Sequence, residues 1–202
     1  MRIHIFKSRR KGLTRLVVGG LHGREGRAVK LILKRFILEG GPRSGMLIVV
    51  PSLCDEAKYV STLSKRYFET EEGRKLLNLL SHYKPDVYVE VHCYSKKAFR
   101  SLTSPMRMVR KGVPQLIELE RGVLIGSSSP LLLSTGLFRL GVTVEVPCRN
   151  GESRDVLLRL LRIVRDREAI SEVLGELMKL YPKQLSEAIK LFEMYKQRLG
   201  LS

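Results

Sequence analysis

The stretch Gly19-Gly20-Leu21-His22-Gly23-Arg24-Glu25-Gly26 lies between an apolar run, Leu16-Val17-Val18, and a long helical pattern. This succession predicts a strand that leads through a glycine-rich loop into a helix. The glycines permit backbone angles that other residues rarely adopt, so the loop can hold a ligand. His22 and Glu25 stand three residues apart, a spacing that lets an imidazole and a carboxylate converge on one metal ion.

Outward from this loop, the hydrophobic periodicity predicts an α/β protein. We expect the first two strands to form a hairpin, and the element order β-β-α-β-α-β-β-α-β to give a mixed, mostly parallel sheet between helices. Strands are predicted at residues 2–6, 14–18, 46–50, 86–92 and 142–146, with one or two more within 116–126. Helices are predicted at residues 28–39 and 70–83, and a short capped helix within 127–140.

The chain of 202 residues is long enough for one domain with a helical appendage. We predict an α/β metallohydrolase-like domain in residues 1–150 and amphipathic helices throughout residues 151–202. These helices either pack on the domain or mediate self-association, and the pattern favours neither. No apolar run approaches the ~20 residues that span a bilayer, and the first residues lack the apolar core of a signal peptide. We therefore expect a cytoplasmic protein without a membrane partner.

The cysteines are Cys54, Cys93 and Cys148. They are too few and too scattered for a disulfide framework or a Cys-x-x-Cys zinc site. We expect reduced thiols, with Cys93 and Cys148 as small buried apolar residues.

The net charge is +17, and residues 1–50 carry twelve Lys and Arg against two Glu. An excess of this size indicates a polyanionic partner or an acidic substrate. A solvated, salt-bridge-rich surface on a protein from a hot environment explains it equally well. The seven Tyr and six Phe are not interleaved with the basic residues, which disfavours single-stranded nucleic acid as a partner.

Acidic and imidazole side chains fall where three predicted strands end. His22 and Glu25 follow the strand at 14–18, His92 ends the strand at 86–92, and Glu145 lies near the end of the strand at 142–146. The carboxyl ends of parallel strands meet at one edge of a sheet, so these four side chains should lie together. Two imidazoles and one carboxylate suit a catalytic zinc ion, and the remaining glutamate suits the base that deprotonates its water.

Two further features belong to the same edge. Glu90 lies two residues before His92 on the same face of its strand, where it would hydrogen-bond the imidazole and hold its tautomer. The spacing Gly20-x-x-Gly23-x-x-Gly26, with Arg24 and Arg27, also suits a phosphate at a helix N-terminus. Glu25 would aim a like charge at that phosphate, so the metal interpretation is favoured.

Three motifs carry a family resemblance: residues 20–26, residues 86–92 and residues 142–145. In order, they resemble the His-x-x-Glu, Asp-Leu-His and Thr-x-Glu signatures of the zinc carboxypeptidase clan, in particular its succinylglutamate desuccinylase and aspartoacylase branch. The short length and the basic, Cys-bearing strands are similar to an uncharacterised family of methanogenic archaea within that clan. The resemblance implies Zn²⁺ bound by His22, Glu25 and His92, with Glu145 as general base. Glu90 stands at the acidic position of Asp-Leu-His.

The same branch usually carries an Asp-Leu-Asn-Arg-x-Phe segment that grips a substrate carboxylate. Here Leu63-Ser64-Lys65-Arg66-Tyr67-Phe68 keeps the Arg and the Phe, so the resemblance implies Arg66 as the carboxylate clamp and Lys65 as a helper. No residue is assigned to polarise the substrate carbonyl.

The leading hypothesis is therefore a zinc-dependent hydrolase of amide bonds in a small acidic N-acyl amino acid or a peptide C-terminus. Two alternatives remain. One is a basic nucleic-acid-binding protein on the same scaffold. The other is a catalytically inactive metal-binding or interaction protein that self-associates through its C-terminal helices.

Overall fold

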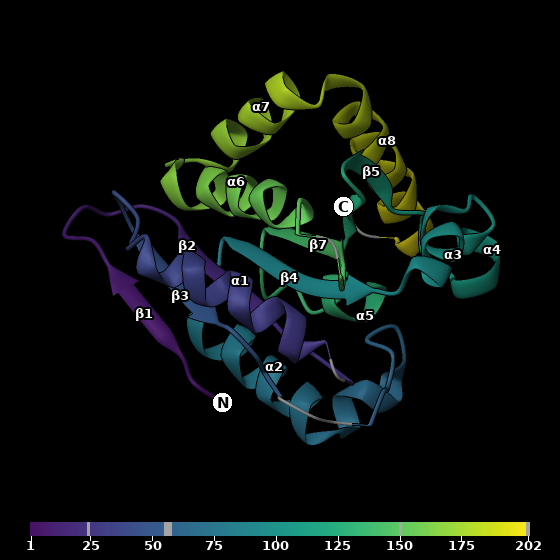
Figure 1. Ribbon diagram of the computed structural model, residues 1–202, viewed down its shortest axis with the longest axis horizontal. Helices are drawn as coiled ribbons and strands as arrows, with labels where there is room; N and C mark the ends of the chain where they lie inside the picture. The colour runs from purple at the N-terminus through teal and green to yellow at the C-terminus, as the bar shows by residue number, and fades with distance from the viewer. Residues whose placement is uncertain (24, 55–57, 150, 201–202) are drawn as a thin grey trace.

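The computed structural model describes residues 1–23, 25–54, 58–149 and 151–200 (Figure 1). The strands form one seven-stranded sheet in the order β1-β3-β2-β4-β7-β6-β5. The four central strands, β3, β2, β4 and β7, run parallel, while β1, β6 and β5 pair antiparallel at the two sides. The strands are β1 His4–Lys7, β2 Thr14–Gly19, β3 Met46–Val50, β4 Val87–Tyr94, β5 Ile117–Glu120, β6 Val123–Ser127 and β7 Leu140–Pro147.

Helices cover both faces of the sheet, so the predicted mixed α/β fold is confirmed (Figure 1). Helices α1 and α6 to α8 share an apolar core with one face, and α2 and α5 share a second core with the other. The short helices α3 and α4, between β4 and β5, were not predicted. The helices are α1 Gly26–Leu38, α2 Glu71–Tyr83, α3 Phe99–Thr103, α4 Arg107–Lys111, α5 Pro130–Leu133, α6 Ser153–Asp166, α7 Ile170–Leu180 and α8 Pro182–Leu199, with 3₁₀ turns η1 Lys65–Glu69 and η2 Lys96–Ala98.

The alternation of strand β2 shows how the sequence builds these two cores. Val17 belongs to the core beneath α1, whereas Leu16 and Val18 belong to the core beneath α2. Successive strand side chains point to opposite faces, so a continuous apolar run is needed where both faces are covered. The site described below lies on the α2 side, because Glu90 and His92 occupy the positions in β4 that alternate with the buried valines of the α1 side.

The predicted N-terminal hairpin is wrong. Strand β1 pairs antiparallel with β3, with Ile5 opposite Ile48, and β2 lies between β3 and β4. The physical reason is burial: β2 is buried along almost its whole length and needs a neighbour on each edge, whereas the alternating exposure of β1 suits an edge strand. The predicted helix within 127–140 is also shorter, since it ends at Leu133 after a start capped by the Ser129 hydroxyl.

The C-terminal helices pack against the sheet. Buried residues of α6, α7 and α8, among them Leu161, Leu177 and Leu185, belong to the same core cluster as Val89 and Val144 of the sheet. Self-association through these helices stays a prediction. Within the described part of the chain, no helix combines the length and apolar character needed to cross a membrane.

Arg15, at the start of β2, is fully buried and hydrogen-bonds only backbone carbonyls among the described residues. Its guanidinium donates to Val164 O at 2.7 Å, to Leu13 O at 2.7 Å and to Ser44 O at 3.0 Å, and also to Arg167 O. Val164 lies in the last turn of α6 and Arg167 follows its end, so Arg15 supplies the donors that the helix terminus lacks. This side chain joins the C-terminal helices to the sheet.

We expect Arg15→Met to lower the free energy of unfolding by roughly 3–5 kcal/mol, because several buried carbonyls lose their donor. Urea denaturation of the full chain measures this. Arg10→Met is the matched control: Arg10 is exposed and pairs with Glu168 at 3.3 Å, so its loss should cost about 0–1 kcal/mol. Equal losses in the two variants would show that the buried hydrogen bonds do not stabilise the fold.

Candidate metal centre

The site lies where the parallel strands β2, β4 and β7 end (Figure 1). Gly19, the last residue of β2, pairs with Val91, and the next residue of β4, His92, pairs with Glu145 of β7. Parallel pairing without a register shift places these ends at one edge of the sheet. The arrangement therefore brings together three segments that are about 70 and 120 residues apart in sequence, as expected for open α/β sheets.

The loop after β2 depends on its glycines. Gly20 has a φ of +59°, and a Cβ there would come within 2.5 Å of Ser52 Oγ. A Cβ on Gly26 would meet the same hydroxyl and lie 2.7 Å from Cys54 O. The segment after β3 holds the loop in turn, since Leu53 N donates to Gly19 O at 2.8 Å and Cys54 N to Gly20 O at 3.0 Å. Close backbone packing thus determines where His22 and Glu25 lie.

We expect Gly26→Ala to displace this loop, because the added methyl group meets backbone atoms that have no room to move. The free energy of unfolding should fall by about 1–3 kcal/mol, and zinc affinity should fall with it. Urea denaturation and zinc titration measure the two effects. Gly175→Ala, in α7, is the control, since a Cβ there meets nothing within 4 Å and alanine favours a helix. Unchanged zinc affinity in Gly26→Ala would contradict the close packing.

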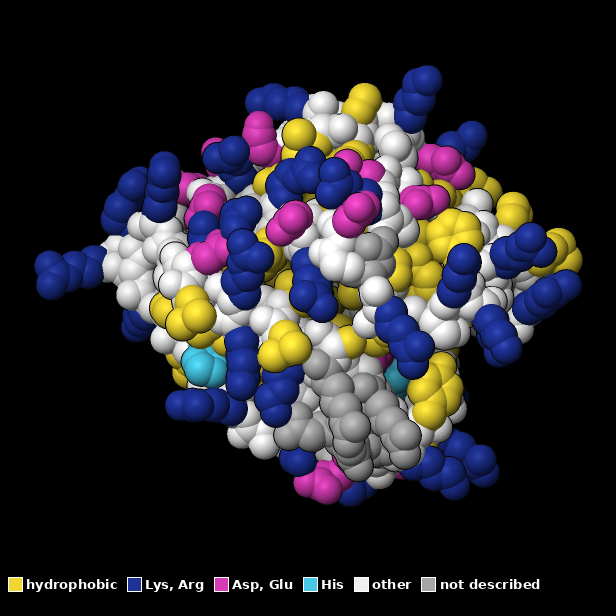
Figure 2. All heavy atoms as spheres, viewed as in Figure 1, with side chains coloured by type: hydrophobic (Ala, Val, Ile, Leu, Met, Phe, Trp, Pro, Cys, Tyr) yellow, Lys and Arg dark blue, Asp and Glu magenta, His cyan; other side chains and the backbone are white. Residues whose placement is uncertain are grey.

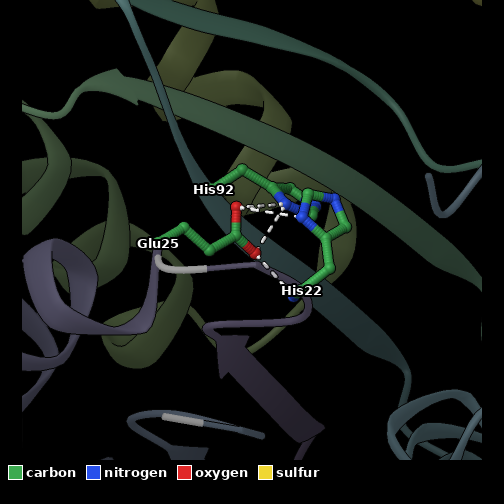
Figure 3. Close-up of side chains that lie close together, drawn as sticks. All are labelled: His22, Glu25 and His92. Atoms are coloured by element: carbon green, nitrogen blue, oxygen red, sulfur yellow. Dashed lines mark hydrogen bonds and ion pairs between the residues drawn. The ribbon is translucent and has the colours of Figure 1, made fainter. Parts of the chain in front are cut away.

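His22, Glu25 and His92 converge in the structure (Figure 3). Each offers one ligand atom, and these atoms lie within 4.8 Å of one another. Both carboxylate oxygens of Glu25 lie 3.1 Å from His92 Nδ1, and Glu25 Oε2 lies 3.6 Å from His22 Nδ1. Two imidazole nitrogens and a carboxylate at this spacing are the donor set of a catalytic zinc site, which keeps a further position for water. The predicted triad is therefore assembled, and zinc binding by it is a prediction.

Glu25 is held by its own loop. Its Oε1 accepts hydrogen bonds from Leu21 N at 2.7 Å and from His22 N at 3.1 Å. These are backbone donors of the kind that cradle a phosphate, and here the carboxylate occupies them. The geometry supports the metal interpretation over the phosphate interpretation. Arg24 lies outside the described residues.

The Glu25 carboxylate favours a proton on the neighbouring His92 imidazole. Burial alone would lower the pKa of His92, but the Glu25 carboxylate beside its Nδ1 raises that pKa to about 10. Burial lowers the pKa of His22 to about 4. Without metal, the pair is therefore a His92 imidazolium and a Glu25 carboxylate, with His22 neutral. Because the pKa of His92 exceeds its ordinary value of 6.5, this pair stabilises the metal-free fold below that value and ceases to do so as pH rises through about 10.

Glu145 lies beside His92 in the sheet register. Its Oε2 is shielded from solvent and has no hydrogen-bond partner among the described residues. Burial raises the pKa of Glu145 to about 7, against the opposing influence of His92. A carboxylate with an open acceptor position and a pKa near neutrality has the properties of a general base.

Glu90 is buried, and its carboxylate lies near the hydroxyl groups of Tyr88 and Thr143 and the imidazole of His92. Tyr88 Oη donates to Glu90 Oε2 at 3.1 Å, and the Thr143 hydroxyl donates to Oε1. Glu90 Oε1 lies 4.0 Å from His92 Nε2, so it faces the ring nitrogen that points away from Glu25. Glu90 was predicted to hydrogen-bond the His92 imidazole and hold its orientation. It lies on the Nε2 side of the ring, but the 4.0 Å between Glu90 Oε1 and His92 Nε2 is longer than a hydrogen bond. Thr143, which belongs to the Thr-x-Glu motif but had no role assigned from the sequence, helps to fix this carboxylate.

The residues predicted to bind substrate lie on η1. Lys65 and Arg66 are exposed, and the buried residue of this turn is Tyr67. Tyr67 Oη donates to Leu21 O at 3.0 Å, and its ring lies 6.4 Å from that of His22. The structure therefore brings Tyr67 to the site loop and leaves Lys65 and Arg66 at the surface. Their role in binding a carboxylate stays a prediction.

Arg107, in α4, is a second residue that sequence reasoning missed. Its Nη1 donates to Pro114 O at 2.5 Å, and its side chain is half-buried. Burial lowers the pKa of Arg107, and Glu145 is the largest opposing charge. The signal in the sequence was its position in an acid-free basic stretch that follows His92 directly. After the His92 imidazolium, Arg107 is thus the cation with the largest influence on the pKa of the candidate base.

Cys93 and Cys148 form a disulfide, with Cα atoms 5.0 Å apart, so the expectation of reduced thiols is wrong for these two residues. Cys93 follows His92 in β4, and Cys148 follows the end of β7, where its backbone N–H donates to Tyr94 O. The parallel register that joins His92 to Glu145 also brings these cysteines together, although 55 residues separate them. Cys54 is outside this disulfide, and its Sγ donates to Gly20 O at 3.4 Å.

One solved structure supports this fold. A product-bound structure of the cell shape determinant protein Csd4 from Helicobacter pylori superposes with a TM-score of 0.50 and 13% identity, over 94% of this chain and 60% of that one. An aspartoacylase family protein from Mesorhizobium loti gives a TM-score of 0.45 and 14% identity, over 77% of this chain and 60% of that one. The chain thus spans about three fifths of these solved chains.

Sequence comparison is more specific. Uncharacterized protein MJ0501 of Methanocaldococcus jannaschii is 37% identical over 190 residues, which cover 92% of this chain and 93% of the relative. The family model described as "Uncharacterized protein conserved in archaea (DUF2119)" matches residues 10–197. The chain that brings together His22, Glu25 and His92 therefore belongs to the family DUF2119, which is conserved in archaea.

Proposed function

We propose that this protein is a zinc-dependent hydrolase of amide bonds, acting on a small acidic N-acyl amino acid or on a peptide C-terminus. The observation that carries the proposal is the convergence of His22, Glu25 and His92 from two strand ends, with Glu145 in the neighbouring register position. The motif resemblance to zinc carboxypeptidases and the fold shared with Csd4 agree with it.

Each residue then has a chemical task. His22, Glu25 and His92 would hold the ion. A bound zinc ion lowers the pKa of its water towards ~7 and polarises a carbonyl. Glu145 would take a proton from the attacking water at its unpartnered Oε2 and pass it to the leaving nitrogen, so that amide and water become a carboxylate and an ammonium group with no net release of protons.

Positive groups favour an anionic substrate. The charge of Arg107 acts on Glu145, and Arg66 lies at the surface next to Tyr67. A guanidinium can bind a carboxylate through two parallel hydrogen bonds, so either residue suits the acidic end of the substrate. We assign the carbonyl-polarising role to neither residue.

The test is a metal-dependence assay on the full chain. Zinc-loaded and EDTA-treated protein are incubated with N-acyl glutamates, N-acyl aspartates and peptides that end in acidic or neutral residues, and the released amine is quantified. We expect release only with zinc. Equal release after EDTA treatment, or none from any substrate in the panel, would contradict the proposal.

A further inference from the structure

The segment between β4 and β5 is rich in positive charge. Residues 95–116 contain six Lys and Arg and no Asp or Glu. We call the elements η2, α3 and α4, residues 96–111, the basic cap. Its exposed cations are Lys96, Lys97, Arg100, Arg110 and Lys111.

Three of the four arginines of α6 differ from these cations, because they pair with acidic side chains. Arg159 pairs with Glu120 at 2.6 Å, Arg162 with Glu39 at 2.5 Å and Arg165 with Asp166 at 2.7 Å. That surface is the salt-bridge network expected of a solvated, stabilised helix. The exposed cations of the basic cap have no acidic partner among the described residues. Figure 2 agrees: over α3 and α4, on the right of the view, dark blue side chains occur without magenta ones.

The basic cap lies next to the candidate metal centre. It begins two residues after Tyr94, where β4 ends, and Figure 1 shows α3 and α4 beyond the arrowhead of that strand. Leu116 N donates to Leu102 O at 2.9 Å, and the Phe99 and Tyr94 rings are 6.1 Å apart, so the cap is packed on the sheet. Arg107 is the half-buried cation of the cap, and its charge lowers the pKa of Glu145 against the effect of burial. The positive surface therefore extends from the reaction site outward.

The side chains of the basic cap favour a peptide over a nucleic acid. Single-stranded nucleic acid is bound by exposed aromatic rings interleaved with cations, and the aromatic residue of the cap, Phe99, is partly buried against Tyr94. Helices α3 and α4 are five residues each, too short to enter a groove as a recognition helix. The exposed apolar residues are Met106 and Val109, which suit aliphatic stems of peptide side chains.

We infer that the substrate is an acidic peptide, whose side-chain carboxylates bind the basic cap while the bond to be cleaved lies at His22, Glu25 and His92. Cleavage of the bound peptide rests on the proposed function. Binding of the peptide rests only on the basic cap. Unpaired cations at the entrance of a site attract and orient an anionic ligand, and that attraction weakens with salt.

The experiment measures binding of fluorescein-labelled hexaglutamate and hexaglutamine to the full zinc-loaded chain by anisotropy. We expect hexaglutamate to bind about tenfold or more tightly than hexaglutamine, with a Kd that rises with salt. The variant Lys96→Glu/Lys97→Glu/Arg100→Glu should raise the Kd for hexaglutamate about tenfold or more. The matched control is Lys7→Glu/Arg9→Glu/Lys11→Glu, which makes the same charge change at exposed positions near the opposite edge of the sheet. It should change the Kd by less than about threefold.

Three results would overturn the inference: equal binding of the two peptides, equal losses in the two triple variants, or tighter binding of a uridine hexanucleotide that is lost in the cap variant. Failure of the proposed function has a different signature. If no substrate is hydrolysed while hexaglutamate still requires the cap, the hydrolase assignment is wrong and acidic-peptide binding stands. The cap variant should lose the preference for acidic peptides, and the control variant should keep it. If the control variant also hydrolyses neutral peptides as efficiently as acidic ones, the hydrolase stands and the inference about its substrate is wrong.

Discussion

Glu145→Gln is expected to reduce turnover by about 10²–10⁴-fold, because it removes the group that accepts the proton of the attacking water. Glutamine keeps the size of the side chain and supplies no base. The affinity for zinc should stay close to that of wild type, since Glu145 lies outside the His22, Glu25 and His92 cluster. Steady-state kinetics with the best substrate of the panel, together with metal analysis of the purified variant, measures both quantities.

The control for this variant is Glu187→Gln, at an exposed position of α8, which should change neither kinetics nor metal content. Loss of zinc from Glu145→Gln would show that Glu145 is itself a ligand, and the base would then have to be sought elsewhere. Full activity with full zinc content would remove Glu145 from the reaction. The pH profile provides a further check: since burial raises the pKa of Glu145 to about 7 in the metal-free protein, activity should fall as pH decreases and this carboxylate becomes protonated.

The position of the candidate site followed from the sequence because local patterns determine it. Each strand that carries a site residue is an apolar run with a clear end, and the parallel alternation of strands and helices places those ends at one edge. His22, Glu25, His92 and Glu145 could thus be grouped before any geometry was known. The strand predicted at 46–50 is observed as β3 Met46–Val50, because a strand buried on both faces is a continuous apolar run with clear ends.

Other features depend on pairings that no local pattern contains. Strand β1 pairs with β3 because both edges of β2 are already paired, with β3 and with β4. This follows from the assembled sheet and from no local pattern. The Cys93–Cys148 disulfide follows from the β4–β7 register. The position of Arg15 in its strand suggests a surface residue, and its burial becomes clear only when α6 packs over it and Val164 O accepts its hydrogen bond. Arg107, whose charge acts on Glu145, lies in a helix of five residues, which is too short for a periodic signal.

Zinc binding by the metal-free protein is expected to release about one proton at neutral pH, because the ion must displace the proton of the His92 imidazolium. His22 contributes no proton, since burial lowers its pKa to about 4. The apparent association constant should therefore rise about tenfold for each pH unit between about pH 6 and pH 9. Calorimetric titrations in buffers of different ionisation enthalpy count the protons directly.

His92→Ala should abolish this linkage together with tight zinc binding, since it removes both a ligand and the group that holds the proton. His82→Ala is the matched control, because His82 is exposed near the end of α2, before β4 begins, whereas His92 lies near the other end of β4. It should keep the affinity and the proton count of wild type. Tight zinc binding in His92→Ala, or pH-independent binding in wild type, would mean that the ion binds elsewhere. The short contact between His92 Nδ1 and Glu25 would then be a buried ion pair that stabilises the strand ends, and the hydrolase proposal would lose the observation that carries it.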